Sequence, residues 1–391
     1  MRMHPLLLVG LTVWAAPAPS LLGEGAYRAQ VLKAFAAQRL RAGARQEALF
    51  GVFRQPLSTR EREALQFLIA GMPLSDLGEA RGEELLAAVR ATHAALDRVP
   101  WGSRLPADIL RHYVLPLRVN NEPVDGFRVA LHRELLDRVR GLDMARAVLE
   151  VNHWCHERVT YQSTDGRTSA PLATLKTTFG RCGEESTFTV AALRAVGIPA
   201  RQVYTPRWAH SDDNHAWVEA WVDGTWRFLG ACEPEPALDR GWFAEPARRA
   251  ILVHTRAYGP YGGPETVIRT TGGSAELNLT ARYAPVKEVP LRVLDSAGRP
   301  VAGATVDFRL YNYGEFYPLA SRTTDAEGRT SLATGRGTLL LWARQGQAFG
   351  HHVLPGEATT PVTLTLDRRP LDLHIDQVPP PEPPARPDPL P

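Results

Sequence analysis

The stretch TFGRCGEESTF, residues 178–188, decides the fold and the chemistry expected of this chain. A helix-forming, largely apolar run continues from it to Val196, where Gly197 and Pro199 prevent continuation. Cys182 is therefore expected at a helix start, beside free N–H groups and the positive end of the helix dipole. Both favour the thiolate, which is the nucleophilic form. The same N–H groups could donate to an oxyanion on an attacked carbonyl, and Gly180 and Gly183 leave room for a substrate backbone.

A cysteine at a helix start also fits a small buried residue, so a second group must accompany it. His215 follows the polar loop at residues 211–214 and opens the segment HAWVEAW, residues 215–221. A base at the mouth of a strand, facing a cysteine on a helix, is the arrangement of thiol acyl-transfer enzymes. The sequence therefore predicts a Cys182–His215 pair.

The surrounding pattern favours an α+β fold with an antiparallel sheet packed on the cysteine-bearing helix. Residues 22–140 are mainly helical in pattern, and Asp143 is a plausible N-cap for a helix whose buried face includes Trp154 and Cys155. Strands are expected at 201–204, 216–222 and 225–229. Asp223-Gly224 between the last two is a strong hairpin signal.

The composition changes near residue 283. Short strands are expected at 289–294, 304–311, 330–333 and 338–343, with turns at 295–298 and 325–328, which is the texture of a small antiparallel β-sandwich. Residues 379–391 contain eight prolines and should form an extended, disordered tail. The expected divisions are a signal peptide at 1–20, a helical region at 21–142, a catalytic domain at 143–282, the sandwich at 283–370 and the tail at 371–391.

Composition and the N-terminus narrow the partners and the location. The 391 residues carry a formal charge of only +3 and show no basic patch interleaved with aromatics, which argues against nucleic acid. A short basic start, an apolar run at 6–16 and small residues at 18–20 are typical of a secretory signal, although a buried N-terminal helix remains an alternative. The run is too short for a permanent membrane span, so a secreted or periplasmic protein is expected.

Three cysteines, Cys155, Cys182 and Cys232, are too few for a disulfide scaffold. Cys155 and Cys232 could pair and leave Cys182 free, or both could be small buried residues. A zinc site from Cys155, His156, Cys182 and His215 would match no standard ligand spacing. The expected mechanism requires no metal and no organic cofactor.

At this point the chain resembles the transglutaminase-like, or transglutaminase core, superfamily, whose catalytic domain has a papain-like fold. The resemblance rests on GRC at 180–182, LRAVGIPAR at 193–201, HAWVE at 215–219 and WRFL at 226–229. It implies a Cys–His–acid site that transfers acyl groups. Members of the family cross-link proteins, hydrolyse peptides or amides, or serve as inactive scaffolds. The C-terminal segment resembles the carboxypeptidase regulatory-like, prealbumin-type domain, which implies an accessory module.

The third site residue departs from the family pattern. The family usually places an aspartate where this chain has Gly230, which cannot orient an imidazole. If Asp223-Gly224 is a two-residue turn, Val222 pairs with Thr225, and the same register places His215 opposite Cys232. A bulge at Gly230 would then turn Glu233 onto the histidine's face. Glu233 is the expected orienting acid, with Asp212 and Asp213 as alternatives that would otherwise hold the loop in a turn conformation.

We therefore expect an exported thiol enzyme acting on amide bonds of protein or peptide substrates, cell-envelope material among them. Cys182 is its nucleophile, His215 its base and Glu233 its acid. Hydrolysis and amine cross-linking share the same acyl-enzyme, so the sequence does not separate them. The alternative is a non-catalytic cell-envelope binding scaffold with the same fold. Gly230 favours the scaffold, whereas the presence of both Cys182 and His215 favours the enzyme.

Overall fold

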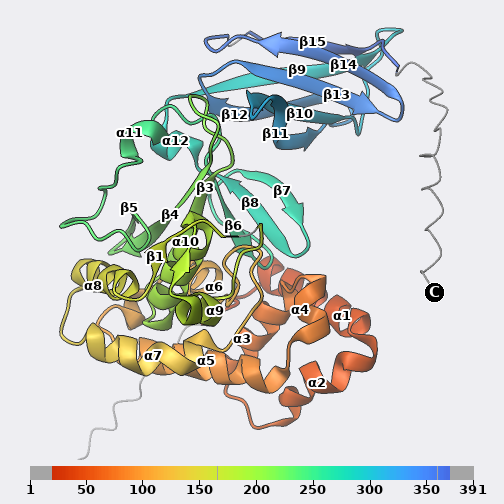
Figure 1. Cartoon of the computed structure of the whole chain (residues 1–391). Coiled ribbons are helices and arrows are strands. Elements are labelled where there is room, and N and C mark those ends of the chain that lie inside the picture. Colours follow the sequence, from red (N-terminus) through yellow and green to blue (C-terminus); the bar gives the residue numbers. More distant parts are fainter. Residues whose placement is uncertain (1–19, 165, 359, 370–391) are drawn as a thin grey trace, which may run out of the picture.

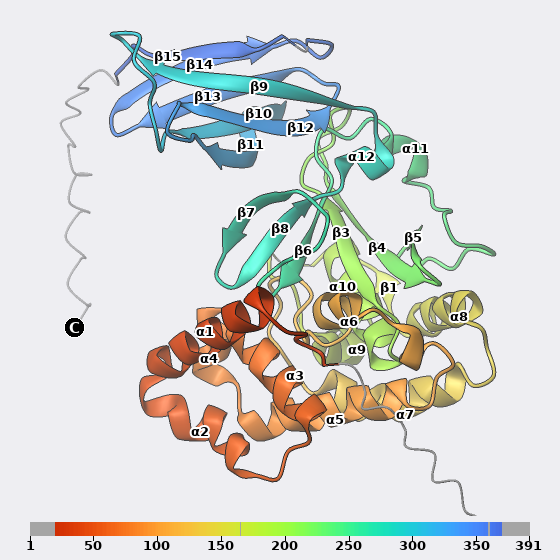
Figure 2. The same cartoon turned by 180° about the vertical axis from the view of Figure 1, so that it is seen from behind.

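The computed structural model describes residues 20–164, 166–358 and 360–369 of the chain. Figures 1 and 2 show the N-terminal helices at one end, a central antiparallel sheet in the middle and a β-sandwich at the other end. This confirms the α+β class. The predicted signal segment up to residue 19 and the proline-rich tail lie outside the described residues. Within the described part, no helix is both long and apolar enough to cross a membrane.

The N-terminal region is helical, as its pattern predicts. Ser58 caps α3, because its hydroxyl accepts the Glu61 N–H at 3.2 Å while the Glu61 carboxylate accepts the Ser58 N–H at 2.8 Å. Leu49, Leu65 and Leu86 lie in the buried core that these helices share. The helices are α1 (Ala26–Arg41), α2 (Gln46–Phe50), α3 (Thr59–Ala70), α4 (Leu74–Glu79), α5 (Gly82–Leu96), α6 (Ala107–Tyr113) and α7 (Phe127–Arg138), with 3₁₀ turns at Gly43–Arg45, Gly51–Arg54 and Gly102–Arg104.

Helix α10 (Cys182–Ala195) lies at the centre of the part of the molecule that packs on the central sheet. Nearly all of its residues after Gly183 are buried, and it packs against α7, α8 (Met144–His156), β3 and β4. Asp143 caps α8 by accepting the Arg146 N–H at 2.9 Å, as predicted. Gly197 follows α10 with φ of 69°, a left-handed conformation that suits glycine and ends the helix. Helix α9 (Pro171–Thr177) precedes α10. The short strands β1 (Thr160–Tyr161) and β2 (Phe179–Gly180) pair in parallel beside the start of α10.

The central sheet has the order β5-β4-β3-β6-β8-β7, with antiparallel neighbours throughout. The sequence indicated β3, β4 and β5 but not the other three strands. Two short helices, α11 (Ala244–Ala247) and α12 (Thr280–Tyr283), lie outside the sheet. The strands are β3 (Ala200–Thr205), β4 (His215–Val222), β5 (Thr225–Leu229), β6 (His254–Tyr258), β7 (Val267–Thr271) and β8 (Ser274–Asn278).

The hairpin register is the predicted one as far as the strands extend. Val222 pairs with Thr225, and Asp223 and Gly224 both have positive φ, at 46° and 98°. The pairing stops at Val218 and Leu229, however, so the bulge predicted at Gly230 is wrong. The chain turns away there instead, and Cys232 takes a left-handed φ of 57°.

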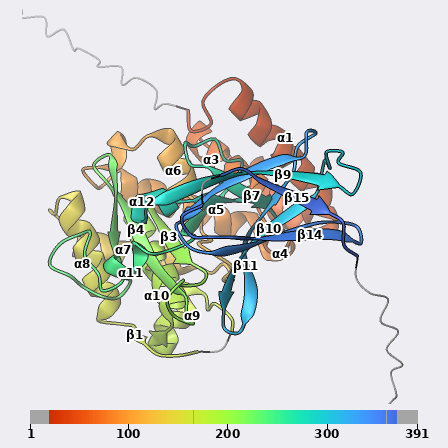
Figure 3. The same cartoon turned by 90° about the horizontal axis from the view of Figure 1, so that it is seen from above.

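The C-terminal part forms two packed sheets, with the orders β11-β10-β13-β14 and β12-β9-β15. Its core includes Val293, Phe308 and Leu341. Figure 3 shows this sandwich lying over β7. The Arg322 side chain donates to the carbonyls of Val267 and Ile268 in β7 at 2.8 and 2.7 Å. Its strands are β9 (Val286–Asp295), β10 (Thr305–Asn312), β11 (Glu315–Thr323), β12 (Arg329–Gly335), β13 (Leu339–Gln345), β14 (Ala348–Leu354) and β15 (Val362–Leu366).

Candidate active site

Cys182 and His215 lie in one cleft of about 600 Å³. Cys182 is the first residue of α10, and its sulfur accepts the backbone N–H groups of Gly183 and Ala216. Since Ala216 follows His215 at the start of β4, the nucleophile candidate lies at the mouth of the strand that carries the base. The predicted pair is therefore brought together.

The pKa of the Cys182 thiol is raised, whereas its position at a helix start predicts a lowered one. Burial raises its pKa above the ordinary value, and the charges of Glu185 and Asp213 act in the same direction. The amides of Ala216 and Gly183 lower the pKa, but burial outweighs them. A buried thiolate loses hydration that two backbone donors do not fully replace. The resting residue is therefore a neutral thiol, and the thiolate expected from the helix terminus does not prevail.

His215 lies in an aromatic enclosure. The residue is 7% exposed, and its ring centroid lies 4.6 Å from Trp242, 5.2 Å from Phe243 and 5.9 Å from Trp217. Burial lowers its pKa to about 4. Its Nε2 is buried and has no hydrogen-bond partner among the described residues. The imidazole is therefore neutral at pH 7 and is held by ring contacts.

Glu233 lines the same cleft, but its carboxylate is directed to Trp242. Trp242 Nε1 donates to Glu233 Oε1 at 3.1 Å, and no hydrogen bond joins Glu233 to His215. A Cβ built on Gly230 would lie 2.3 Å from Glu233 Oε2. The Glu233 carboxylate thus occupies the space in which a side chain at position 230 would begin.

The two alternative acids stabilise the loop before His215. Asp212 Oδ1 accepts the N–H of Tyr313 from the sandwich at 2.8 Å. Asp213 Oδ1 accepts the N–H of Asn214 at 2.7 Å, and the Asp213 carbonyl accepts the N–H of Trp208 at 2.9 Å. Asp213 also lines the cleft. Neither carboxylate makes a hydrogen bond to the imidazole.

The sandwich forms part of the site. Residues 317–321 of β11 line the same cleft as Cys182. Asn312 Nδ2 donates to the carbonyls of Trp208 and Ser211 at 3.0 and 2.8 Å, and Arg207 stacks on the Tyr317 ring at 4.0 Å. The sandwich therefore fixes the loop that leads to His215.

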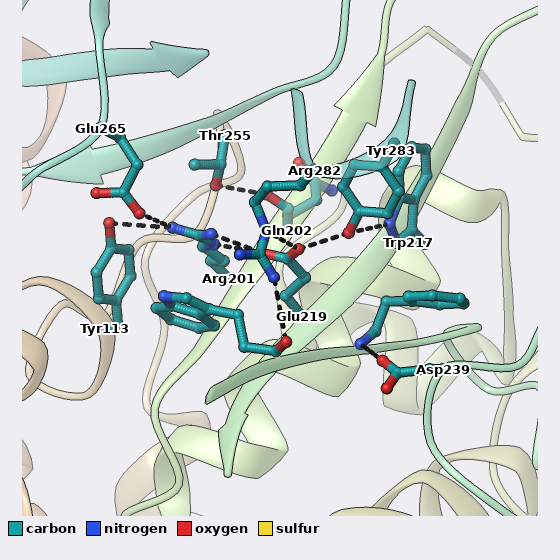
Figure 4. A network of polar contacts seen from close by, with 12 residues as sticks. Tyr113, Arg201, Gln202, Trp217, Glu219, Asp239, Thr255, Glu265, Arg282 and Tyr283 are labelled. Atoms are coloured by element: carbon teal, nitrogen blue, oxygen red, sulfur yellow. Dashed lines mark hydrogen bonds and ion pairs between the residues drawn. The ribbon is translucent and has the colours of Figure 1, made fainter. Parts of the chain in front are cut away.

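A buried ion-pair network supports the other side of the base (Figure 4). Arg201 Nε donates to Glu219 Oε2 at 2.7 Å, and Arg282 Nε and Tyr283 Oη donate to Glu219 Oε1 at 2.9 and 2.6 Å. Trp217 Nε1 in turn donates to Tyr283 Oη at 3.0 Å, and the Trp217 ring is stacked on His215. The network thus holds one wall of the imidazole enclosure.

The remaining cysteines are buried free thiols that lie beside each other, so the disulfide alternative is not realised in this structure. A hydrogen-bonding contact with Cys155 and burial raise the pKa of Cys232 well above its ordinary value. The described residues contain no group of three or more His, Cys, Asp or Glu side chains that could hold a metal. The residues considered for zinc therefore do not converge.

Trp242 and Glu185 are among the cleft residues that sequence reasoning missed. A long irregular segment separates Trp242 from β5, so the sequence around Trp242 does not indicate that its ring reaches His215. Glu185 offered a signal, because it lies three residues after Cys182, one helical turn further along the same face. It is 4% exposed and lines the cleft.

One family model matches the part of the chain that contains both Cys182 and His215. Residues 133–231 match the family model described as the transglutaminase-like superfamily, so this part of the chain is a transglutaminase-like domain. No curated protein matches the chain. The prealbumin-type assignment of the sandwich stays a prediction.

Among solved structures, three similar ones carry names related to this chemistry. A candidate cysteine protease from Cytophaga hutchinsonii is 19% identical at a TM-score of 0.28, over 48% of this chain and 68% of that one. A candidate protease from Parabacteroides distasonis is 13% identical at a TM-score of 0.27, over 57% of this chain and 36% of that one. Red sea bream transglutaminase is 11% identical at a TM-score of 0.26, over 73% of this chain and 59% of that one.

Proposed function

We propose that this protein is an exported thiol enzyme that acts on amide bonds of protein or peptide substrates through Cys182 and His215. The observation that carries the proposal is the contact between the Cys182 sulfur and the N–H of Ala216, next to His215, in a cleft large enough for a peptide segment. Cleft and pair together support acyl transfer rather than a buried structural cysteine.

The neutral resting state suggests general-base catalysis. The Cys182 sulfur attacks the amide carbonyl while His215 takes the thiol proton, and the imidazolium then returns that proton to the leaving amine. Since Nε2 is buried, Nδ1 is the nitrogen that exchanges the proton. The thioester so formed is released by water, which gives hydrolysis, or by a second amine, which gives a cross-link.

Glu233 acts in this proposal as a positioning residue. It reaches the imidazole through Trp242, whose indole donates to its carboxylate and packs against His215. The predicted role of Glu233, to orient the base, is thereby retained in an indirect form.

The second candidate, a non-catalytic cell-envelope scaffold, is favoured by one observation, the raised pKa of the Cys182 thiol. Turnover separates the two. A labelled peptide library is incubated with the wild-type protein and with the Cys182→Ala variant, and products are identified by mass spectrometry. The enzyme requires products that disappear in the variant. Equal product formation by both proteins, or none by either, would refute the proposed mechanism.

A further inference from the structure

Glu185 presents an unpaired carboxyl to the catalytic cleft. The residue is 4% exposed and lines the cleft, yet its carboxyl oxygens accept no hydrogen bond from any described residue. It lies one turn of α10 beyond Cys182, about 5 Å along the helix axis. Whatever group satisfies this carboxyl must therefore lie close to the attacked amide.

The charged groups that act most strongly on the pKa of Glu185 are acidic, although Arg181, Arg256 and Arg269 also line the cleft. Burial, followed by the charges of Glu233 and Glu184, raises its pKa to about 8, and no cation offsets them. The groups that interact with Glu185 electrostatically across the cleft and the core are Glu184, Glu233, Cys182, Cys232 and Tyr161. Burial also raises the pKa of Glu233, with only the Trp242 indole as a donor.

Other buried carboxylates among the described residues have a partner within the chain. The carboxylate of Glu122 accepts the N–H groups of Val119 and Asn120, and several others bind a guanidinium. Glu219 is bound by Arg201 and Arg282, Glu63 by Arg28, and Glu184 by Arg181. A buried carboxyl without such a partner is costly in its charged form, and an arriving cation removes that cost. The contrast suggests that the missing partner of Glu185 is supplied from outside the chain.

We propose that Glu185 and Glu233 form a subsite for an ammonium group on the peptide whose amide Cys182 attacks. The inference rests on the proposed function and names the substrate class: peptides with a lysine-like side chain within one or two residues of the attacked amide. That spacing follows from the single helical turn between Cys182 and Glu185, since one extended residue spans about 3.5 Å. Binding an ammonium replaces the proton on Glu185 by the cation.

The ratio of kcat/KM for a lysine peptide to that for a norleucine peptide tests the subsite. Matched peptides carrying lysine, norleucine or glutamate beside the susceptible amide are compared by kcat/KM at pH 7.5. We expect the wild type to prefer lysine over norleucine by about tenfold, as for one charge-assisted contact. Glu185→Gln and Glu233→Gln should bring this ratio close to one. Glu235→Gln, which removes an exposed neighbouring carboxylate that does not line the cleft, should leave the ratio unchanged. An unchanged ratio in Glu185→Gln, or a wild type that prefers norleucine or glutamate, would overturn the proposal.

Binding tests the subsite independently of turnover. The Cys182→Ala variant is titrated calorimetrically with the lysine peptide between pH 6 and pH 9. Because the proton on Glu185 must leave, affinity should rise about tenfold per pH unit below pH 8, with proton release to the buffer. Adding Glu185→Gln should abolish this pH dependence. If the wild type turns over none of the peptides while this titration succeeds, the proposed reaction fails and the subsite stands. Binding that does not depend on pH, or that equals that of the norleucine peptide, would refute the subsite.

Discussion

The indole of Trp242 lies against the imidazole of His215, with ring centroids 4.6 Å apart and planes inclined by 51°. The same indole donates from Nε1 to Glu233 at 3.1 Å. Trp242 is otherwise largely open to solvent, at 60% exposure. One wall of the enclosure around His215 is therefore an exposed side chain that a hydrogen bond to Glu233 holds in place, and in the proposed mechanism Glu233 acts through this wall.

Removing that hydrogen bond should slow catalysis without abolishing it. Trp242→Phe keeps a ring beside His215 but loses the donor, and Glu233→Gln keeps a weaker neutral acceptor. We expect kcat on a neutral peptide to fall about fivefold in Trp242→Phe and less in Glu233→Gln, which matches the loss of one hydrogen bond of about 1 kcal/mol. Trp221→Phe, outside the cleft, is the control. A Trp242→Phe enzyme with the wild-type kcat would show that the indole does not position the base.

The pH dependence of kcat/KM should be that of an uncharged Cys182 thiol and an uncharged His215 imidazole. Burial lowers the pKa of His215 to about 4, so the unprotonated base is available above that pH. We expect kcat/KM on a neutral peptide to stay level from pH 7 down to about pH 5 and to fall near pH 4. Burial raises the pKa of Cys182, so alkylation by iodoacetamide should still be increasing above pH 9. An acidic limb at pH 6 to 7 would contradict the neutral pair.

The sandwich should control the loop before His215. Asn312→Ala removes two hydrogen bonds to the carbonyls of Trp208 and Ser211, and the Ser211 carbonyl keeps the N–H of Asp213. We expect faster amide hydrogen exchange at residues 206–214 and a kcat reduced several-fold, while the sandwich core remains folded. Thr363→Ala, on an exposed position of β15, provides the matched control. Unchanged exchange in this loop would show that the contact is incidental.

Breaking the buried network should destabilise the protein strongly. Arg201→Met leaves Glu219 buried with one of its cations missing, which typically costs about 3–5 kcal/mol. Arg140→Ala removes an exposed ion pair with Asp137 and should cost less than about 1 kcal/mol. Urea unfolding followed by tryptophan fluorescence measures both. Similar midpoints for the two variants would show that the network does not stabilise the sheet.

What the sequence predicts well depends on short-range contacts. The turn at Asp223 and Gly224 needs positive φ at adjacent residues, so the local pair determines the turn and the register of β4 and β5. Cys182 is recognisable at a helix start for the same reason. These features place the nucleophile and the base without knowledge of distant segments.

What the sequence misses depends on contacts between segments far apart in the chain. The predicted register does not continue beyond Leu229, because the chain turns at Cys232. The direction of the Glu233 side chain depends on Trp242, which lies nine residues later. The contribution of β11 to the cleft requires the sandwich to lie over the sheet, and the local pattern of the strands carries no such information. The direction of Glu233 and the walls of the cleft are therefore poorly predicted, whereas Cys182 and His215 do lie in one cleft, as the sequence pattern indicates.

Gly230 offers the most direct test of the missing acid. The family pattern places aspartate there, but a Cβ at this position would lie 2.3 Å from Glu233 Oε2. Gly230→Asp alone should therefore displace Glu233 from Trp242 and lower kcat. Gly230→Asp combined with Glu233→Ala frees the space, and the new carboxylate can then approach the unpaired Nε2 of His215. We expect the double variant to recover kcat to at least the wild-type value and to shift the acidic limb of kcat/KM upward, because a nearby carboxylate stabilises the imidazolium. Gly230→Asn with Glu233→Ala, which adds no charge, separates the electrostatic effect from the steric one. A double variant with no shift of the acidic limb would show that position 230 does not face the base.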